Sequence, residues 1–114
     1  MKIPLAYLEH RVTLRPVKAV SPSTGLAYDP DIPKVPALVV DKVHQVVDQR
    51  PSSETRGQTI SASTQIVCRK ERWIRPDSII IVWPGTPMER ETVVVAAGYN
   101  QHTQAPESAQ FWVI

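Results

Sequence analysis

Three histidines are the first side chains to consider for catalysis or metal binding. His10, His44 and His102 lie far apart in the sequence, and none is spaced as a ligand pair with another histidine, a cysteine or a carboxylate. Polar loop or strand-face positions therefore suit these histidines better than a metal site. We expect no bound metal.

Cys68 and the pair Asp29 and Asp31 are the other candidates. Cys68 lies on the apolar face of an alternating segment, which favours a buried, inert thiol over a nucleophile, and a lone cysteine excludes an internal disulfide. A proline separates the two aspartates and no longer acidic loop follows, so a rigid turn is favoured over a calcium site. With four glycines and no glycine-rich phosphate loop, the chain is expected to be neither an enzyme nor a cofactor-binding protein.

The composition is that of one ordinary globular domain spanning residues 1–114. The chain is 42% hydrophobic and 21% charged. It has no apolar run of about 18 residues, the length that a membrane span requires. We expect no membrane partner, no signal peptide and synthesis in a reducing cytoplasm. The net charge of +2 is spread evenly along the chain, since residues 1–57 carry eight Lys and Arg against six Asp and Glu, and residues 58–114 carry five against five.

The apolar patterns predict a β protein. Runs rich in Ile and Val at 78–83 and 91–97 are too short for buried helices and form a central hairpin closed by the proline-rich segment 84–90. Residues 58–69 alternate cleanly between apolar and polar side chains, as in a strand with one covered face. Further strands are expected at 8–20, 35–48 and 109–114, with connections at 21–34, 49–57 and 98–107. We therefore predict an all-β, six-stranded, mostly antiparallel barrel or sandwich with long loops.

This order of elements resembles the head-to-tail stopper, or head-closure, proteins that complete the heads of long-tailed bacteriophages. The likeness is carried by the segments 11–14, 37–41, 64–67, 74–81 and 111–113, and most of all by the turn Arg75-Pro76-Asp77-Ser78 that leads into an isoleucine run. It implies a small β-barrel that assembles as a dodecameric homo-oligomeric ring in the virion, at the head–tail interface. In that family, the ring lies between the portal and adaptor complex on the head side and the tail terminator and tail tube on the other.

The resemblance also implies a channel-closing loop that holds the packaged DNA until the tail opens it. Carried onto this chain, the loop runs from 49 to 57, with Asp48 and Gln58 at its root. Arg50 and Arg56 could meet phosphate and are balanced by Asp48 and Glu54, so a neutral loop would close the channel sterically without adhering to DNA. An ordinary surface loop is the alternative. The residues assigned to this loop are Asp48, Gln49, Arg50, Pro51, Ser52, Ser53, Glu54, Thr55, Arg56, Gly57 and Gln58.

Contacts with neighbouring subunits, the adaptor or the tail are expected from two other connections. The segment 84–90 is longer than the tight turn of the family, and the sequence stops at its last predicted strand without a C-terminal arm. Segments 21–34 and 84–90, together with strand edges, would then make these contacts. The residues assigned to them are Leu26, Tyr28, Asp29, Asp31, Pro84, Thr86 and Met88.

Two other functions are alternatives. A phage tail-terminator or tail-completion protein shares the location and the β-rich build, but usually places a helix on its sheet, and no segment here is convincingly helical. A small nucleic-acid-binding barrel would interleave aromatic and basic side chains on one strand face. Trp73, Trp83 and Trp112 do not follow such a pattern.

Overall fold

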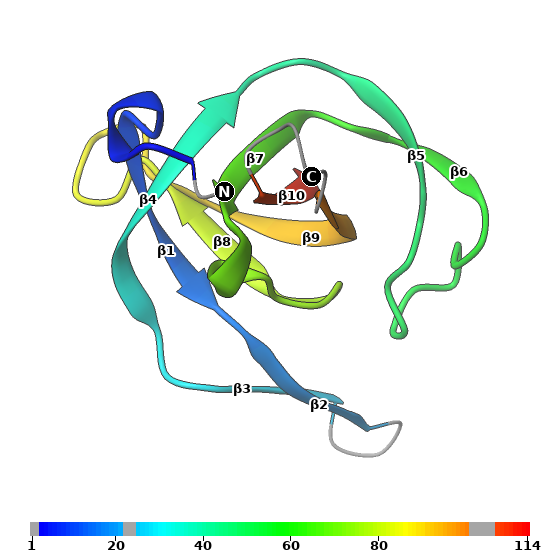
Figure 1. Ribbon diagram of the computed structural model, residues 1–114. Coiled ribbons are helices and arrows are strands. Elements are labelled where there is room, and N and C mark those ends of the chain that lie inside the picture. Colours follow the sequence, from blue (N-terminus) through cyan, green and yellow to red (C-terminus); the bar gives the residue numbers. More distant parts are fainter. Residues whose placement is uncertain (1–2, 22–24, 101–106) are drawn as a thin grey trace.

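Six antiparallel strands close into a barrel, as the sequence predicts. The structure is a computed structural model that describes residues 3–21, 25–100 and 107–114. Around the barrel the strand order is β1-β4-β7-β10-β9-β8, and pairing of β8 with β1 closes it (Figure 1). The strands of the barrel are β1 (His10–Arg15), β4 (Ile32–Val40), β7 (Thr64–Arg69), β8 (Ile79–Val82), β9 (Arg90–Asn100) and β10 (Ser108–Val113).

The barrel interior is filled by the apolar side chains of alternate strand positions. Val12 and Leu14 point inward from β1, and Ile66 and Cys68 from β7, as the alternation predicts. Phe111 of β10 is the largest fully buried side chain. Because burying one such side chain contributes roughly 1.5 to 3 kcal/mol, the interior supplies most of the favourable free energy of folding. The core cluster comprises Val12, Leu14, Val35, Ala37, Val39, Ile66, Cys68, Ile74, Ile80, Val82, Val94, Ala109, Phe111 and Val113.

The predicted central hairpin is present as β8 and β9, with Ile79 opposite Val93. The prediction that the second strand ends at residue 97 is wrong, because β9 continues to Asn100. There Gly98 pairs with Gln110 and Tyr99 with Ala109, so the ladder with β10 makes a strand of a segment that has few apolar residues. Residues 101–106, which include His102, lie outside the described residues.

A two-stranded hairpin replaces much of the long connection predicted at 21–34. After Pro16 the chain leaves the barrel as β2 (Val17–Ser21) and returns as β3 (Gly25–Tyr28), with Val20 opposite Leu26. The return to the barrel as β4 begins at Ile32, also inside the predicted connection. The turn-forming residues of this segment give no sequence signal for β3, which forms because β2 pairs with it.

A second hairpin extends the barrel between β4 and β7. It consists of β5 (His44–Val47) and β6 (Thr59–Ala62), with Val46 opposite Ile60. The segments predicted as single strands at 35–48 and 58–69 are thus each divided in two, the first between β4 and β5 and the second between β6 and β7. Residues 48–58 join the two strands of this hairpin.

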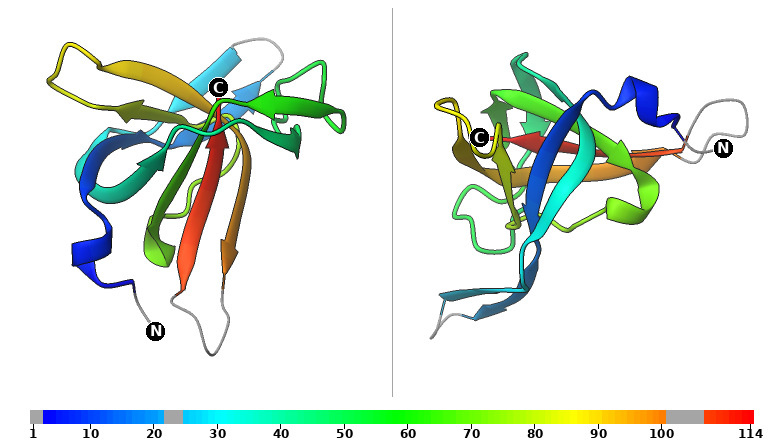
Figure 2. Two further views of the ribbon diagram at one scale, coloured as in Figure 1. Left: turned by 90° about the horizontal axis from the view of Figure 1, so that it is seen from above. Right: turned by 90° about the vertical axis from the view of Figure 1, so that its left-hand side faces the viewer.

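The projections gather at one end of the barrel. Both views in Figure 2 place the β2–β3 hairpin, the β5–β6 hairpin and the β8–β9 loop toward one end, and the N-terminal segment toward the other. The short 3-10 turns η1 (Leu5–Tyr7) and η2 (Lys70–Arg72) belong to the N-terminal end. Among the described residues, no helix has the length and apolar character to cross a membrane.

Candidate functional site

The loop between β5 and β6 is closed at its root by backbone hydrogen bonds. The Asp48 N–H donates to the Gln58 carbonyl and the Gly57 N–H to the Asp48 carbonyl, both at 2.9 Å. Gly57 has a φ of 86°, a left-handed conformation that glycine adopts without steric cost. The residues predicted to form the channel-closing loop, 48–58, are therefore one continuous structural unit.

The carboxylate of Asp48 is the centre of this loop. The residue is 1% exposed and accepts hydrogen bonds from Arg50 through its backbone N–H (3.0 Å), Nε (3.1 Å) and Nη2 (3.0 Å). The Ser53 hydroxyl donates to it at 2.6 Å, and the Thr55 hydroxyl donates to the same oxygen. An anion buried in this way is tolerated because each side of the carboxylate meets a donor. The loop folds around Asp48.

These contacts set the charge state of the loop. The hydrogen bonds from Arg50, followed by those from Ser53 and Thr55, outweigh the effect of burial and hold the pKa of Asp48 well below its usual range. The guanidinium of Arg50 is engaged in this ion pair and its side chain is only 19% exposed, whereas Glu54 and Arg56 face the solvent. Of the two arginines expected to meet phosphate, Arg56 is the one whose side chain is exposed.

The loop also lies against the barrel. The Gln49 N–H donates to the Val95 carbonyl at 2.7 Å, and the Ala97 N–H donates to Gln49 Oε1 at 3.1 Å, so Gln49 occupies the edge of β9 that β10 leaves open. Ser52 donates to the buried carboxylate of Asp77, from its N–H at 2.9 Å and from its hydroxyl. Far from being a freely solvated segment, the loop is docked through both Gln49 and Ser52.

Asp77 belongs to the turn Arg75-Pro76-Asp77-Ser78, which also holds the β2–β3 hairpin. The Val17 N–H donates to Ser78 Oγ at 2.9 Å, and the guanidinium of Arg75 donates to the carbonyls of Val17 (3.3 Å) and Lys18. The sequence marks this turn as a motif without assigning a role to its side chains. Its signal is an unusual concentration of polar hydrogen-bonding groups directly before a buried strand.

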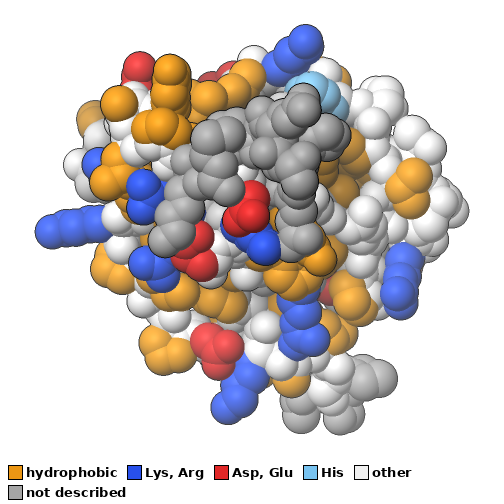
Figure 3. Space-filling model, viewed as in Figure 1, with side chains coloured by type: hydrophobic (Ala, Val, Ile, Leu, Met, Phe, Trp, Pro, Cys, Tyr) orange, Lys and Arg blue, Asp and Glu red, His pale blue; other side chains and the backbone are white. Residues whose placement is uncertain are grey.

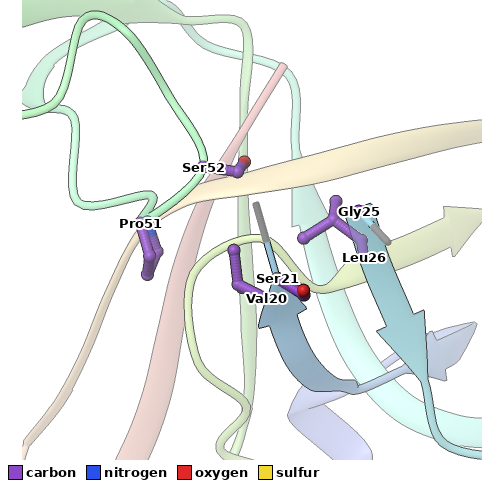
Figure 4. Close-up of a pocket in the computed structure, with 6 residues that line it drawn as sticks. All are labelled: Val20, Ser21, Gly25, Leu26, Pro51 and Ser52. Atoms are coloured by element: carbon purple, nitrogen blue, oxygen red, sulfur yellow. The ribbon is translucent and has the colours of Figure 1, made fainter. Parts of the chain in front are cut away.

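A cavity of about 480 Å³ separates the hairpin from the loop (Figure 4). Val20, Ser21, Gly25 and Leu26 line it from the hairpin, and Pro51 and Ser52 line it from the loop. Leu26, predicted to make contacts with other proteins, thus lies between the β2–β3 hairpin and the 48–58 loop.

The other predicted contact residues are distributed over the same end of the barrel. Asp29 and Asp31 flank the return from the hairpin, where Asp31 accepts from Arg15 Nε at 2.8 Å and this hydrogen bond lowers the pKa of Asp31. Burial, reinforced by the negative charge of Asp77, raises the pKa of Tyr28. In the β8–β9 loop, Pro84 is half-buried and Thr86 donates to the Trp83 carbonyl at 2.7 Å. Met88 of the same loop is 71% exposed.

The described residues among those considered for chemistry are not brought together. His10 accepts a hydrogen bond at Nδ1 from the Val39 N–H (3.0 Å) and lies edge-on to Trp83, with ring centroids 4.7 Å apart. His44 is at the start of β5. Over the described residues, no three His, Cys, Asp or Glu side chains are grouped to hold a metal ion.

The prediction of a buried thiol is confirmed, since Cys68 is fully buried in the barrel interior. Burial raises the pKa of this thiol to about 12. A thiol with such a pKa is protonated at neutral pH and is a poor nucleophile.

Comparison of the chain with models of known families, with curated proteins and with solved structures finds no match. No activity or partner is therefore transferred from a relative. The contacts of the 48–58 loop and of the turn beside it are the observations that bear on function.

Proposed function

We propose that this protein is a structural component of a bacteriophage virion that forms a homo-oligomeric ring at the portal vertex. The ring closes the DNA channel after packaging and provides the surface to which the tail attaches. The proposal has no catalytic step. It begins from the resemblance of the sequence to head-closure proteins and is supported by the construction of the 48–58 loop.

The observation that carries the proposal is a stiff, electrically neutral loop at the tip of an extended hairpin. A loop that blocks DNA sterically must resist displacement, and the hydrogen bonds to the Asp48 carboxylate supply that stiffness within eleven residues. Asp48 and Glu54 balance Arg50 and Arg56. Each phosphate contact would add a salt-dependent contribution to DNA affinity, so a neutral loop blocks the channel without retaining the DNA during ejection.

The two hairpins also suit assembly into a ring. Each is a separate two-stranded sheet within the described part of the chain, and the outer edge of such a sheet can pair with a strand of another subunit. Exposed apolar side chains accompany them, including Val43 (65%) directly before β5, Val47 (51%) in β5 and Met88 (71%) in the β8–β9 loop. Ring assembly would bury this apolar surface.

The face of the molecule shown in Figure 3 is less suited to the nucleic-acid-binding alternative. Positive and negative side chains are interspersed on the face shown in Figure 3, in the manner of an ordinary solvated surface. Binding along a nucleic-acid backbone favours a continuous basic stripe.

DNA retention by tailless, DNA-filled heads tests the proposal. Heads assembled without this protein are treated with nuclease, before and after the purified protein is added back, and the protected DNA is measured. We expect leakage without the protein and protection once it is restored. If heads hold their DNA without it, or leak in its presence, the channel-closing function is wrong and a role in completing the tail becomes the one to test.

A loop variant then separates closure from attachment. Deletion of residues 52–55 removes the tip, and it also removes two hydroxyl donors to Asp48, so a second variant, Glu54→Ala with Arg56→Ala, trims the tip while leaving every described contact of Asp48 in place. Both variants should bind to heads and protect less DNA than the wild type. The matched control is Glu9→Ala, an exposed position that precedes β1 near the N-terminal end. Protection equal to the wild type by both loop variants would contradict the assignment of the loop.

A further inference from the structure

The turn at residues 75–78 lies between the two extensions of the barrel and contacts both. On one side, Arg75 and Ser78 hold the first residues of β2. On the other side, Asp77 holds Ser52 in the 48–58 loop. Arg75 and Asp77 are two positions apart, so neighbouring side chains of one short turn bind segments that lie far from each other in the sequence.

The turn is held in a defined conformation. Pro76 restricts its own φ, and Asp77 has a φ of 79°, which is uncommon for a residue with a side chain. The Asp77 N–H donates to the Val94 carbonyl and the Val94 N–H to the Ser78 carbonyl, both at 2.9 Å. With its backbone bound to β9 in this way, the turn holds the side chains of Arg75, Asp77 and Ser78 in a defined arrangement relative to one another.

Opening of the loop must break the contact between Asp77 and Ser52, in addition to the contacts of Gln49 with β9. Asp77 is 1% exposed, and both of its carboxylate oxygens accept from Ser52. Hydrogen bonds to a charged group are stronger than those between neutral groups, so loss of this contact should change the population of an open loop tenfold or more. The cavity lined by Val20, Leu26 and Pro51 lies between the hairpin and the loop, and the turn contacts both segments.

We propose that the turn at 75–78 couples the seating of the β2–β3 hairpin to the docking of the 48–58 loop. A partner that pulls the hairpin away from Arg75 and Ser78 thereby weakens the hold of Asp77 on Ser52 and favours an open loop. By thermodynamic reciprocity, release of the loop loosens the hairpin by the same factor. The biological meaning, channel opening upon engagement of the hairpin, rests on the proposed function, whereas the coupling is a property of the isolated chain.

Amide hydrogen exchange on the purified protein tests the coupling. The reporters are the Ser52 N–H, which donates to Asp77, and the Val17 N–H, which donates to Ser78. Arg75→Ala removes contacts on the hairpin side only. We expect exchange of the Val17 amide and of the Ser52 amide to accelerate at least tenfold. Acceleration at Val17 with unchanged exchange at Ser52 would overturn the proposal.

The reverse perturbation and two controls complete the experiment. Ser52→Ala retains the N–H at position 52 but removes the hydroxyl donor, and it should accelerate exchange of the Val17 amide. Thr86→Ala removes a side-chain hydrogen bond in the β8–β9 loop, away from the turn, and should change neither reporter. If Arg75→Ala unfolds the barrel, as loss of protection at Phe111 would reveal, Ser78→Ala replaces it with the same expectation. Because the chain is studied alone, a negative result here leaves DNA retention by filled heads as a separate question.

Discussion

Replacing Asp48 by Asn tests whether the buried carboxylate organises the 48–58 loop. The amide oxygen at the Oδ1 position could still accept from Arg50 N and Nε, at 3.0 and 3.1 Å in the wild type. The amide nitrogen would face the donors that now meet Oδ2. Hydroxyl groups can turn and accept a hydrogen bond, but Arg50 Nη2 can only donate, so its bond to Oδ2 is lost and the guanidinium loses its counter-charge.

The cost follows from this loss. A hydrogen bond to a charged group contributes about 1.5 to 3 kcal/mol, and disrupting a well-buried ion pair costs about 3 to 5 kcal/mol. Because the Arg50 side chain is 19% exposed, the pair is not fully buried and the cost falls toward that of a single charged hydrogen bond, so we expect a loss of about 2 to 3 kcal/mol. The melting temperature should fall by about 10 °C. Urea unfolding followed by tryptophan fluorescence measures the loss directly.

Asp41→Asn is the matched control. Asp41 also accepts from an arginine and a threonine, Arg90 at 3.1 Å and Thr64 at 2.8 Å, but its side chain is 62% exposed. Exposed ion pairs contribute about 0 to 1 kcal/mol, so this variant should be nearly as stable as the wild type. If the two variants lost equal stability, Asp48 would not be the organising centre of the loop.

The stability lost in Asp48→Asn should depend on pH. The pKa of Asp48 is depressed in the folded protein, so its stabilising contribution is complete above the unfolded pKa of about 3.9 and is lost as the pH falls from there toward the lower folded pKa. The difference in stability between the wild type and Asp48→Asn should therefore be constant at neutral pH and shrink below about pH 4. Urea titrations at pH 7 and pH 3 measure it, and an undiminished difference at pH 3 would argue against the depressed pKa.

The remaining predictions concern the barrel interior. Ile80 is fully buried, so Ile80→Asp should abolish cooperative folding by burying an unpaired charge, whereas Ile80→Val should cost only about 1 kcal/mol of stability. Circular dichroism during thermal unfolding distinguishes the two variants. A cooperative transition in the Asp variant would show that Ile80 is outside the core. Cys68, with its pKa raised to about 12, should resist alkylation by iodoacetamide at pH 8 until urea unfolds the chain, and rapid modification of the native protein would be incompatible with its burial.

Local pattern was sufficient to predict the strands of the barrel. Side chains alternate between the two faces of a strand, so the apolar members of each run identify the inward face before any partner strand is known. Val12 and Leu14 in β1, and Ile66 and Cys68 in β7, are buried for this reason. The same reasoning placed the central hairpin, where β-branched residues fill both strands.

Where this reasoning failed, pairing with a partner strand decided which residues form a strand. Gly25–Tyr28 lies among turn-forming residues and becomes a strand only because β2 pairs with it. Residues 98–100 extend β9 because β10 supplies the ladder. The sequence of one segment does not predict which partner strand will lie beside it in the folded protein.

The contacts of the candidate site likewise depend on the folded structure. From its sequence, the loop at 48–58 reads as a polar, solvated segment, and its length and neutral charge are correctly apparent there. Burial of Asp48 arises only when the loop closes and aligns its donors around the carboxylate, and the bond from Ser52 to Asp77 joins residues 25 positions apart. The alternation of apolar and polar side chains that predicts a strand is a local pattern with a period of two residues. The docking of a polar loop depends instead on hydrogen-bond geometry that only the closed barrel creates.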